Sequence, residues 1–302
     1  MKVLITDGIS KEGLAILQNA GLEITQQQYP PEELVAVIKD YEAIIVRSAT
    51  KVTREVIEAG TKLKVIARGG VGVDNIDTAF AKEKGIPVLN TPGASAASVA
   101  ELAIAHMFAV SRFLHLGSLE MRAGKWPKKE FSKGIELSSK TCGILGFGSI
   151  GKEVGKRALG LGMNVVVYDP YFSPAAYEVE QASKEDVLAR ADFLTLHLPL
   201  DKAAGPTIGT AEFAMMKKGV VLVNCARGGV VDEAALLAAL ENGTVFGAGL
   251  DVFASEPPTE AQQALINHPR IAVSPHIGGS TVEGQARVGT EIAEKVAAAL
   301  TT

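Results

Sequence analysis

The stretch TCGILGFGSIGKEVGKRALG, residues 141–160, decides the fold of the surrounding chain. The apolar run 141–145 predicts a buried strand, which leads into the pattern G-x-G-x-x-G at Gly146, Gly148 and Gly151. The first glycine permits a tight turn, the second lets a pyrophosphate approach the backbone, and the third lets the next helix pack on the strand. Backbone amides at the start of that helix can then bind the negatively charged pyrophosphate. The stretch therefore predicts a phosphate-binding turn.

The strand predicted at 165–168 ends at Asp169, about 20 residues beyond the glycines, where a ribose-binding acid is expected. Its carboxylate accepts hydrogen bonds from both ribose hydroxyls and repels a 2′-phosphate, so NAD is favoured over NADP. The alternative is a glycine-rich turn followed by an incidental acid. The order of strand, turn, helix, strand and acid favours a dinucleotide site.

Short runs rich in β-branched residues alternate with helical patterns on both sides of this turn, and this alternation predicts an α/β fold. The other predicted strands are 3–6, 43–46, 65–67, 193–196, 220–224, 249–252 and 271–273. The predicted helices include 11–20, 31–39 and a closing helix at 281–300. A long helix after the turn at 90–93 is expected to run to about Arg122, with Ser98 and Glu101 as a capping box.

Composition excludes several classes of protein. The 302 residues, 47% hydrophobic and 21% charged, are typical of a globular chain with two domains. The net charge of −4 and the lack of a strongly basic stretch argue against a nucleic-acid partner. Cys142 and Cys225 lie in apolar strand-like runs, which predicts buried free thiols, and no metal-ligand spacing is present. With no secretion signal and no apolar run of about 20 residues, we expect a cytoplasmic protein without a membrane partner.

Three polar residues, Arg227, Glu256 and His276, each follow a predicted strand in the second half of the chain. Ligands bind beyond the carboxyl ends of parallel strands, so these side chains are expected to converge on one crevice. Histidine takes or gives a proton near neutral pH, a glutamate orients its ring, and an arginine holds a carboxylate. This set suits oxidation of a secondary alcohol, although each residue alone is compatible with a surface charge. The remaining histidines are interpreted as structural: His106, His115, His197 and His268.

With these residues identified, nearly the whole chain resembles the D-isomer-specific 2-hydroxyacid dehydrogenase family. Five ordered motifs carry the resemblance: VRSATKVT at 46–53, GVGVDN at 70–75, NCARGG at 224–229, LDVF at 250–253 with EPP at 256–258, and SPHIG at 274–278. Within the family, these motifs are most similar to those of the phosphoglycerate dehydrogenases.

The resemblance implies two Rossmann-like, doubly wound parallel-sheet domains. Residues 1–93 and 284–302 would form the substrate-binding domain, and an NAD-binding domain, 94–283, would be inserted between them. It implies that Arg227, Glu256 and His276 are catalytic and that the protein is a homodimer joined through the NAD domains. The NAD-binding residues it implies, together with those of the glycine turn, are Val71, Gly146, Gly148, Ser149, Ile150, Gly151, Asp169, Leu198, Cys225, Ala226, Arg227, Asp251, His276 and Gly278.

The resemblance favours 3-phosphoglycerate as the substrate, which NAD oxidises to 3-phosphohydroxypyruvate at the start of L-serine biosynthesis. Substrate contacts are expected at Arg47, Ser48, Gly70, Arg227 and His276, with Lys128 and Arg68 as further cations. Two alternatives stay open: a hydroxypyruvate or glyoxylate reductase, whose substrate lacks the phosphate, and an NAD-sensing corepressor-like binding protein. The sequence contains no counterpart of the C-terminal extension that binds serine in some phosphoglycerate dehydrogenases, so we expect no feedback through such a module.

Overall fold

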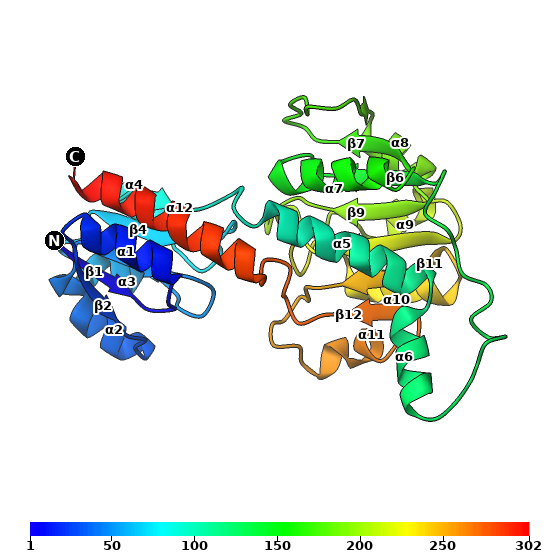
Figure 1. Cartoon of the computed structure of the whole chain (residues 1–302), viewed down its shortest axis with the longest axis horizontal. Helices are drawn as coiled ribbons and strands as arrows, with labels where there is room; N and C mark the ends of the chain where they lie inside the picture. The colour runs from blue at the N-terminus through cyan, green and yellow to red at the C-terminus, as the bar shows by residue number, and fades with distance from the viewer. Residues whose placement is uncertain (302) are drawn as a thin grey trace. The chain divides into compact units, whose positions relative to one another are not determined.

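The computed structural model describes residues 1–301, and internal contacts divide the chain into two compact units. Unit 1 comprises Met1–Ala96 together with the segment from Gly279 onward, and unit 2 comprises Ala97–Gly278. The sequence prediction placed the divisions at 93/94 and 283/284, whereas the contacts place them after Ala96 and after Gly278. Each unit is an α/β fold around one parallel sheet, as the alternating pattern predicts (Figure 1).

Unit 1 contains a five-stranded sheet in the order β2 (Glu23–Gln26), β1 (Lys2–Ile5), β3 (Ala43–Val46), β4 (Val65–Arg68) and β5 (Val88–Leu89). Helices α1 (Lys11–Asn19) and α12 (Val282–Thr301) cover one face. The other face is covered by α2 (Pro31–Val37), η1 (Ile38–Asp40), α3 (Arg54–Ala59) and α4 (Thr78–Glu83). Strand order reverses between β1 and β3, the point at which such sheets bind ligands.

Burial on both faces explains why the inner strands of unit 1, β1, β3 and β4, are largely apolar runs. In β3, Ala43 and Ile45 pack toward α1 and α12, whereas Ile44 and Val46 pack toward the opposite helices. The first and last helices approach each other at two glycines, since a Cβ on Gly13 would lie 2.4 Å from the carbonyl oxygen of Gly289. This contact ties the C-terminal helix to the N-terminal residues, side by side in Figure 1.

Unit 2 contains a seven-stranded parallel sheet in the order β12 (Ile271–Val273), β11 (Val245–Leu250), β10 (Val220–Asn224), β9 (Phe193–Leu196), β6 (Thr141–Leu145), β7 (Asn164–Tyr168) and β8 (Glu180–Gln181). Helices α5 (Ala96–Ser111) and α7 (Ser149–Gly160) cover one face. The other face is covered by α8 (Lys184–Arg190), α9 (Thr210–Met215), α10 (Glu233–Glu241) and α11 (Gln263–Ile266), which follows η2 (Glu260–Gln262). Strand order reverses between β6 and β9, so the glycine turn after β6 lies at the switch point.

The prediction of one helix running to Arg122 was wrong. Helix α5 ends at Ser111, and α6 (Leu114–Arg122) follows at an angle of 64°. Phe113 adopts a left-handed conformation at the break, with φ of 54°, and its ring stacks on Phe131 at 5.6 Å. Aromatic packing therefore accompanies a turn that no glycine or proline announces in the sequence.

The predicted capping box was also wrong, because α5 begins at Ala96 and Ser98 is a buried residue inside it. The carboxylate of Glu101 accepts a hydrogen bond from Arg157 at 2.8 Å instead. The side chain of Glu101 therefore faces α7 rather than the start of its own helix.

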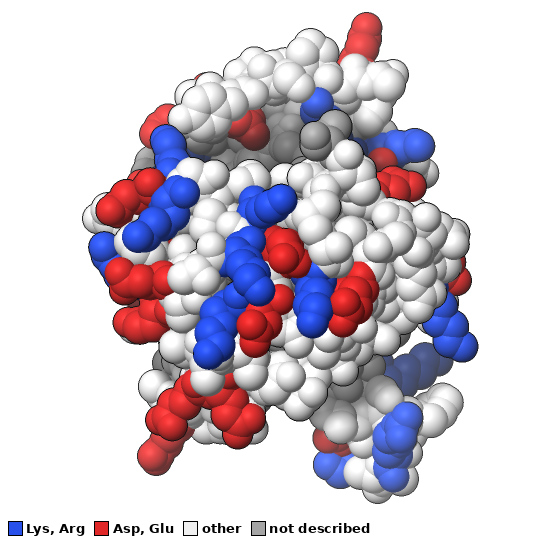
Figure 2. Space-filling view, turned by 90° about the vertical axis from the view of Figure 1, so that its left-hand side faces the viewer, with Lys and Arg blue, Asp and Glu red and all other residues white. Residues whose placement is uncertain are grey.

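Most predicted strands have the expected bounds, but the strand predicted at 249–252 is β11, which ends at Leu250. The edge strands β2, β5 and β8 were not predicted, since they are short and lack a continuous apolar run. Both cysteines are buried and free, as predicted. Among residues 1–301 no single helix is long and apolar enough to cross a membrane; only the bent pair α5 and α6 passes that test together. Acidic and basic side chains intermingle on the face drawn in Figure 2.

Candidate active site

The loops that follow β10, β11 and β12 start side by side in unit 2. In the sheet register Asn224 pairs with Leu250, and Leu250 pairs with Val273, so the three strands end on one line. The amide of Asp251 donates to the carbonyl of Asn224 at 3.0 Å, and the amide of His276 donates to the carbonyl of Asp251 at 2.8 Å. The predicted convergence of the three loops is therefore built from backbone hydrogen bonds.

The first two loops also touch at Gly228. A Cβ at this position would lie 1.7 Å from the carbonyl oxygen of Phe253, so only glycine allows the loops to approach this closely. The contact brings the loop that carries Arg227 against the loop that carries Glu256.

His276 and Glu256 form a direct pair, with Nδ1 of the imidazole 2.5 Å from Oε2 of the carboxylate. Oε1 of Glu256 accepts the amide of Phe253 at 3.2 Å. Burial alone would raise the pKa of Glu256, but the hydrogen bond and charge of His276, the Phe253 amide and the charge of Arg227 together lower it. The Arg227 guanidinium itself donates from Nη1 to the carbonyl of Ala226 at 2.7 Å.

The lowered pKa of Glu256 determines how the pair responds to pH. A carboxylate whose folded-state pKa lies below the usual value is charged at neutral pH. The stability that the charged carboxylate contributes is present above the usual carboxyl pKa, and it is lost as the pH falls through the lowered folded-state pKa. The pair of Glu256 and His276 is therefore intact in the neutral range.

A cavity of about 470 Å³ opens at this pair. Its walls come from the loops after β11 and β12, with Pro257, Pro258 and Ile266 providing apolar surface beside Glu256 and His276. The side chain of His276 is 46% exposed, and its Nδ1 is occupied by Glu256. The second ring nitrogen, Nε2, is consequently the one available to a ligand.

The glycine turn fits a dinucleotide. A Cβ on Gly146 would lie 2.3 Å from the carbonyl oxygen of His197, and one on Gly151 would lie 2.1 Å from that of Gly146. Gly148 differs, because no atom lies within 4 Å of a Cβ built there. Gly146 and Gly151 thus permit close packing, and Gly148 keeps free the space where a pyrophosphate approaches the backbone.

Asp169 lies directly after β7, with Oδ2 accepting the amide of Phe147 at 2.6 Å and Oδ1 accepting the amide of Tyr171 at 2.7 Å. These bonds fix the carboxylate beside the glycine turn while leaving lone pairs on both oxygens for ribose hydroxyls. The residues present therefore fit NAD.

The other predicted cofactor residues of unit 2 lie at strand ends or at the turn. Ser149 and Ile150 open α7, Leu198 follows β9, and Cys225 and Ala226 follow β10. Burial, with a smaller contribution from the charge of Asp251, raises the pKa of the Cys225 thiol, so that thiol stays protonated.

Asp251 is only 1% exposed, and its carboxylate binds the loop itself. Oδ1 accepts the amide of Ile277 at 2.9 Å, and Oδ2 accepts the amide of Gly278 at 2.8 Å. Two predicted cofactor residues, Asp251 and Gly278, are therefore bonded to each other, and the carboxylate supports the loop that carries His276.

The predicted residues of unit 1 gather at the carboxyl ends of β3 and β4. Arg47 follows β3 at the switch point, and Arg68, which ends β4, donates from Nε to the carbonyl of Arg47 at 3.4 Å. Gly70 has a φ of +152°, and a Cβ there would lie 2.6 Å from the Arg68 guanidinium. Ser48 and Val71 are the neighbours of Arg47 and Gly70 in these two loops. Lys128 is in unit 2, exposed in the turn after α6 and absent from the cavity wall.

Three of the other histidines have structural partners, as interpreted from the sequence. His115 lies between the carbonyls of Ala109 and Pro269, and His268 pairs with Glu241 at 3.4 Å. His197 hydrogen-bonds Thr195 at 2.8 Å, and burial lowers its pKa to about 3, so its ring is neutral. His106 has a partner in the active-site region and is considered separately below.

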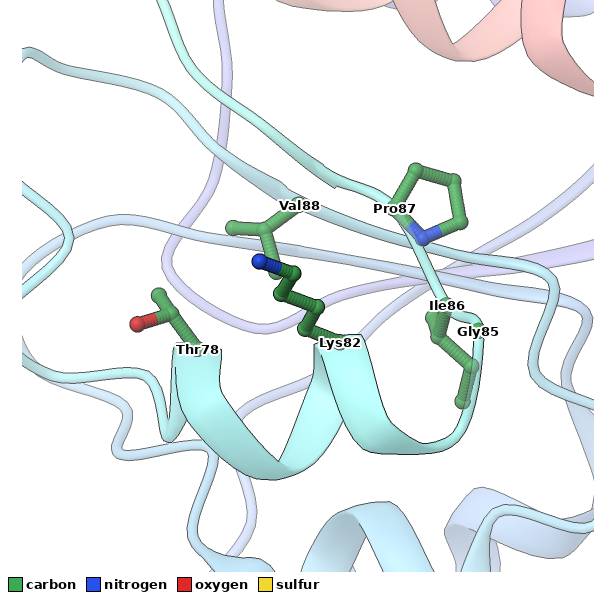
Figure 3. A pocket seen from close by; sticks show the side chains of 6 residues that line it. All are labelled: Thr78, Lys82, Gly85, Ile86, Pro87 and Val88. Carbon is green, nitrogen blue, oxygen red and sulfur yellow. The ribbon is translucent and has the colours of Figure 1, made fainter.

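A second cavity, of about 370 Å³, lies in unit 1 between α4 and β5 (Figure 3). Lys82 extends across it toward Val88, with Thr78 on the same helix and Pro87 opposite. The cavity is at the amino end of β5, whereas ligands of parallel sheets bind beyond the carboxyl ends. We assign no catalytic role to it.

The geometry at Gly148 predicts that a substitution there weakens cofactor binding without lowering the stability of the fold. Gly148→Ala adds a methyl group where the protein has open space, so the folded state should be as stable as before. The methyl would occupy the pyrophosphate position, and the Kd for NADH should rise about tenfold or more. Fluorescence titration with NADH and thermal unfolding measure the two effects.

Gly160→Ala, at the last residue of the same helix and equally open, is the matched control and should leave the Kd unchanged. Unaltered NADH binding by Gly148→Ala would contradict this placement of the pyrophosphate.

Comparisons with known proteins identify the family of the chain. A family model described as D-isomer specific 2-hydroxyacid dehydrogenase, NAD binding domain, matches residues 104–278. The chain is 47% identical over 297 residues to a hydroxypyruvate reductase of Thermotoga maritima, covering 98% of this chain and 97% of that protein. It is 46% identical over 296 residues to the D-3-phosphoglycerate dehydrogenase of Rattus norvegicus, covering 97% of this chain but 55% of that protein.

The chain thus spans about half the length of the rat relative. Among solved structures, a glyoxylate reductase from Paecilomyes thermophila superposes with a TM-score of 0.89 at 33% identity, covering 98% of this chain and 94% of that one. The family model matches more than half of the chain, and both curated relatives match nearly all of it. These matches and the glycine turn indicate the same family. The chain belongs to the D-isomer-specific 2-hydroxyacid dehydrogenases, a family of NAD-dependent oxidoreductases.

Proposed function

We propose that this chain oxidises 3-phosphoglycerate with NAD to give 3-phosphohydroxypyruvate and NADH, the first step of L-serine biosynthesis. The observation that supports this substrate most is Arg47, a half-buried cation at the switch point of the unit 1 sheet. Its Nε is buried without a hydrogen-bond partner among the described residues. A buried polar group normally has a hydrogen-bond partner, and a phosphate oxygen suits a guanidinium.

Hydrogen bonds with Asp7 and Asn75 hold the loop around Arg47 in one conformation. The carboxylate of Asp7, after β1, accepts the amide of Arg47 at 2.7 Å and both the amide and the hydroxyl of Thr50, at 3.0 and 2.6 Å. Asn75 donates to the carbonyls of Arg47 and Thr50. Burial lowers the pKa of Arg47, partly opposed by the charge of Asp7, and the guanidinium remains charged at neutral pH. With Arg68 beside it, unit 1 presents two cations to an anion.

We assign the reaction itself to unit 2. Glu256 holds the Nδ1 proton of His276, which leaves Nε2 unprotonated to accept the proton of the C2 hydroxyl. The imidazolium formed is stabilised by the charge of Glu256. Arg227 binds the carboxylate of the substrate and polarises the C2 oxygen. NAD, when bound, supplies the acceptor for the hydride that leaves C2. In the reverse direction His276 donates the same proton.

The substrate is tested by removing the Arg47 charge. Arg47→Gln should lower kcat/KM for 3-phosphoglycerate by about tenfold or more, because a charge-assisted hydrogen bond is worth about 1.5–3 kcal/mol. The same variant should leave kcat/KM for D-glycerate, which lacks the phosphate, within about threefold. Initial rates of NADH formation, followed by the absorbance of NADH, measure both.

Arg54→Gln is the control, since Arg54 lies in the same unit with its guanidinium 4.0 Å from the centre of the Phe80 ring. It should change neither rate. A wild-type chain that turns over D-glycerate far better than 3-phosphoglycerate, with Arg47→Gln without effect on either, would contradict the proposed substrate.

Hydroxypyruvate reduction is the second candidate. It is favoured by the hydroxypyruvate reductase of Thermotoga maritima, which matches this chain over 97% of its own length. The two reactions share Arg227, Glu256 and His276 and differ only in the phosphate. The comparison of phosphorylated and unphosphorylated substrates therefore decides between them.

We also propose that the protein is a homodimer. The surface of α6 and the following turn exposes several apolar side chains, of which Trp126 is 75% exposed: Leu114, Leu119, Met121 and Trp126. Large apolar side chains exposed along α6 and the turn after it support an interaction surface there, and a second copy of the chain is the partner that family resemblance favours. A molar mass of one chain in light scattering would contradict this.

A further inference from the structure

Two buried side chains, His106 and Asp251, and the partly buried Ser274 form a hydrogen-bonded chain at the base of the loop of His276. Nε2 of His106, on α5, lies 2.9 Å from the hydroxyl of Ser274, and that hydroxyl lies 2.6 Å from Oδ1 of Asp251. His106 is 5% exposed and Asp251 1% exposed. The sequence interpretation gave His106 a structural role, and nothing in its surroundings along α5 indicates a link to residues 251 and 274.

The direction of each hydrogen bond follows from the donors available. The oxygens of Asp251 already accept the amides of Ile277 and Gly278, and the hydroxyl of Ser274 donates its only proton to the same carboxylate. Ser274 can then only accept from His106, so Nε2 of His106 carries a proton. Burial lowers the pKa of His106, opposed by the charge of Asp251 and assisted by that of His115. The ring is therefore neutral, and its single N–H is used on Ser274.

Packing holds the His106 ring in place. A Cβ on Gly249 in β11 would lie 2.5 Å from the Cβ of His106 and 3.0 Å from its Nδ1. The imidazole thus lies directly on the backbone of β11, two residues before Asp251. A side chain at position 249 would displace it, so the glycine and the histidine form one packing unit.

The end of this chain supports a strained residue. His276 has a φ of 53°, a left-handed conformation that costs a non-glycine residue of the order of 1 kcal/mol. Its amide is held by the carbonyl of Asp251 at 2.8 Å, and the next two amides are held by the Asp251 carboxylate. A rotated carboxylate would release residues 277 and 278 and, with them, the conformation that directs His276 to Glu256.

We propose that His106 is a positioning residue for the dehydrogenase reaction: through Ser274 it fixes the Asp251 carboxylate, which in turn holds residues 276–278 and so places the His276 ring against Glu256. The inference rests on the proposed function for the role of His276 as the proton acceptor. The hydrogen-bonded chain itself stands on the geometry of unit 2 alone.

The test compares three variants of the full-length protein. His106→Leu has a side chain of similar size but no donor for Ser274, and it should lower kcat about tenfold. His106→Gln keeps a side-chain N–H directed at Ser274 and should recover kcat to within about threefold of wild type. Ser274→Ala breaks the chain at its next link and should resemble His106→Leu. Rates are measured with whichever 2-oxo acid the wild type reduces fastest.

The double variant His106→Leu with Ser274→Ala distinguishes this role from general destabilisation. If both residues act through one chain, its loss in kcat should be no greater than that of either single variant. Losses that multiply, equal losses for His106→Leu and His106→Gln, or a wild-type kcat for His106→Leu would each overturn the proposal.

Hydrogen exchange separates this inference from the proposed function. In His106→Leu, the amides of Ile277 and Gly278 should exchange at least about tenfold faster, while those of α7 and β6 stay protected as in wild type. This readout needs no turnover, so it holds even if no 2-hydroxy acid is a substrate and the proposed function fails. Unchanged exchange at residues 277 and 278 would overturn the proposal.

Discussion

His276→Gln should lower kcat by about a thousandfold or more and leave the Kd for NADH within about threefold of wild type. The Nδ1 of the imidazole is bonded to Glu256, which leaves Nε2 for the substrate, and general acid–base catalysis contributes about 10²–10⁴ to the rate. Glutamine fills a similar volume and still bonds Glu256, but it neither accepts nor gives up a proton near neutral pH. Steady-state rates and NADH fluorescence measure the two quantities.

His268→Gln is the control for this variant. His268 also pairs with a carboxylate in unit 2, that of Glu241, but is absent from the wall of the catalytic cavity. Its replacement should leave kcat within about twofold. Near-wild-type turnover in His276→Gln would remove His276 from the mechanism, and the role of Glu256 would fail with it.

Arg227→Lys should lower kcat/KM for the hydroxy acid by about a hundredfold, almost as much as Arg227→Ala. A guanidinium binds a carboxylate through two parallel hydrogen bonds, whereas an ammonium presents a point charge that makes only one such contact well. The loss should appear in KM and in kcat, since in the proposed mechanism the arginine both holds the carboxylate and polarises the reacting oxygen. Initial rates over a range of substrate concentrations check this.

Arg190→Lys provides a comparison within the same unit. Arg190 makes two parallel contacts to Glu180, at 2.5 and 2.7 Å, on an exposed surface. Replacing it should leave kcat/KM unchanged because exposed ion pairs contribute little even to stability. Full activity in Arg227→Lys would show that charge alone is enough and that the two-point contact is absent.

The parts of the fold that the sequence predicted are those whose signal is local. Strands β3, β6, β9, β10 and β12 are largely apolar runs, and their bounds were predicted residue for residue. The glycine turn was predicted for a similar reason, because Gly146 and Gly151 permit approaches that any side chain would block. The adjacency of the three loops that carry Arg227, Glu256 and His276 followed from one general property, that parallel strands end on the same edge.

The parts that were missed depend on contacts between distant residues. The bend at Phe113 coincides with aromatic packing on Phe131 and Phe246, which lie far along the chain. The edge strand β2 is half polar, and its pairing with β1 becomes visible only in the folded sheet. The link from His106 to Asp251 depends on α5 packing against Gly249, which has no side chain. No periodicity along the chain encodes these contacts.

The central claim is that Arg227, Glu256 and His276 act on one substrate molecule, and a crystal structure with NADH and the 2-oxo acid analogue oxamate tests it most directly. We predict that Nε2 of His276 lies within hydrogen-bonding distance of the oxamate carbonyl oxygen, with the Arg227 guanidinium on its carboxylate and Glu256 still bonded to Nδ1. Oxamate bound beside NADH without contact to His276 and Arg227 would contradict the account.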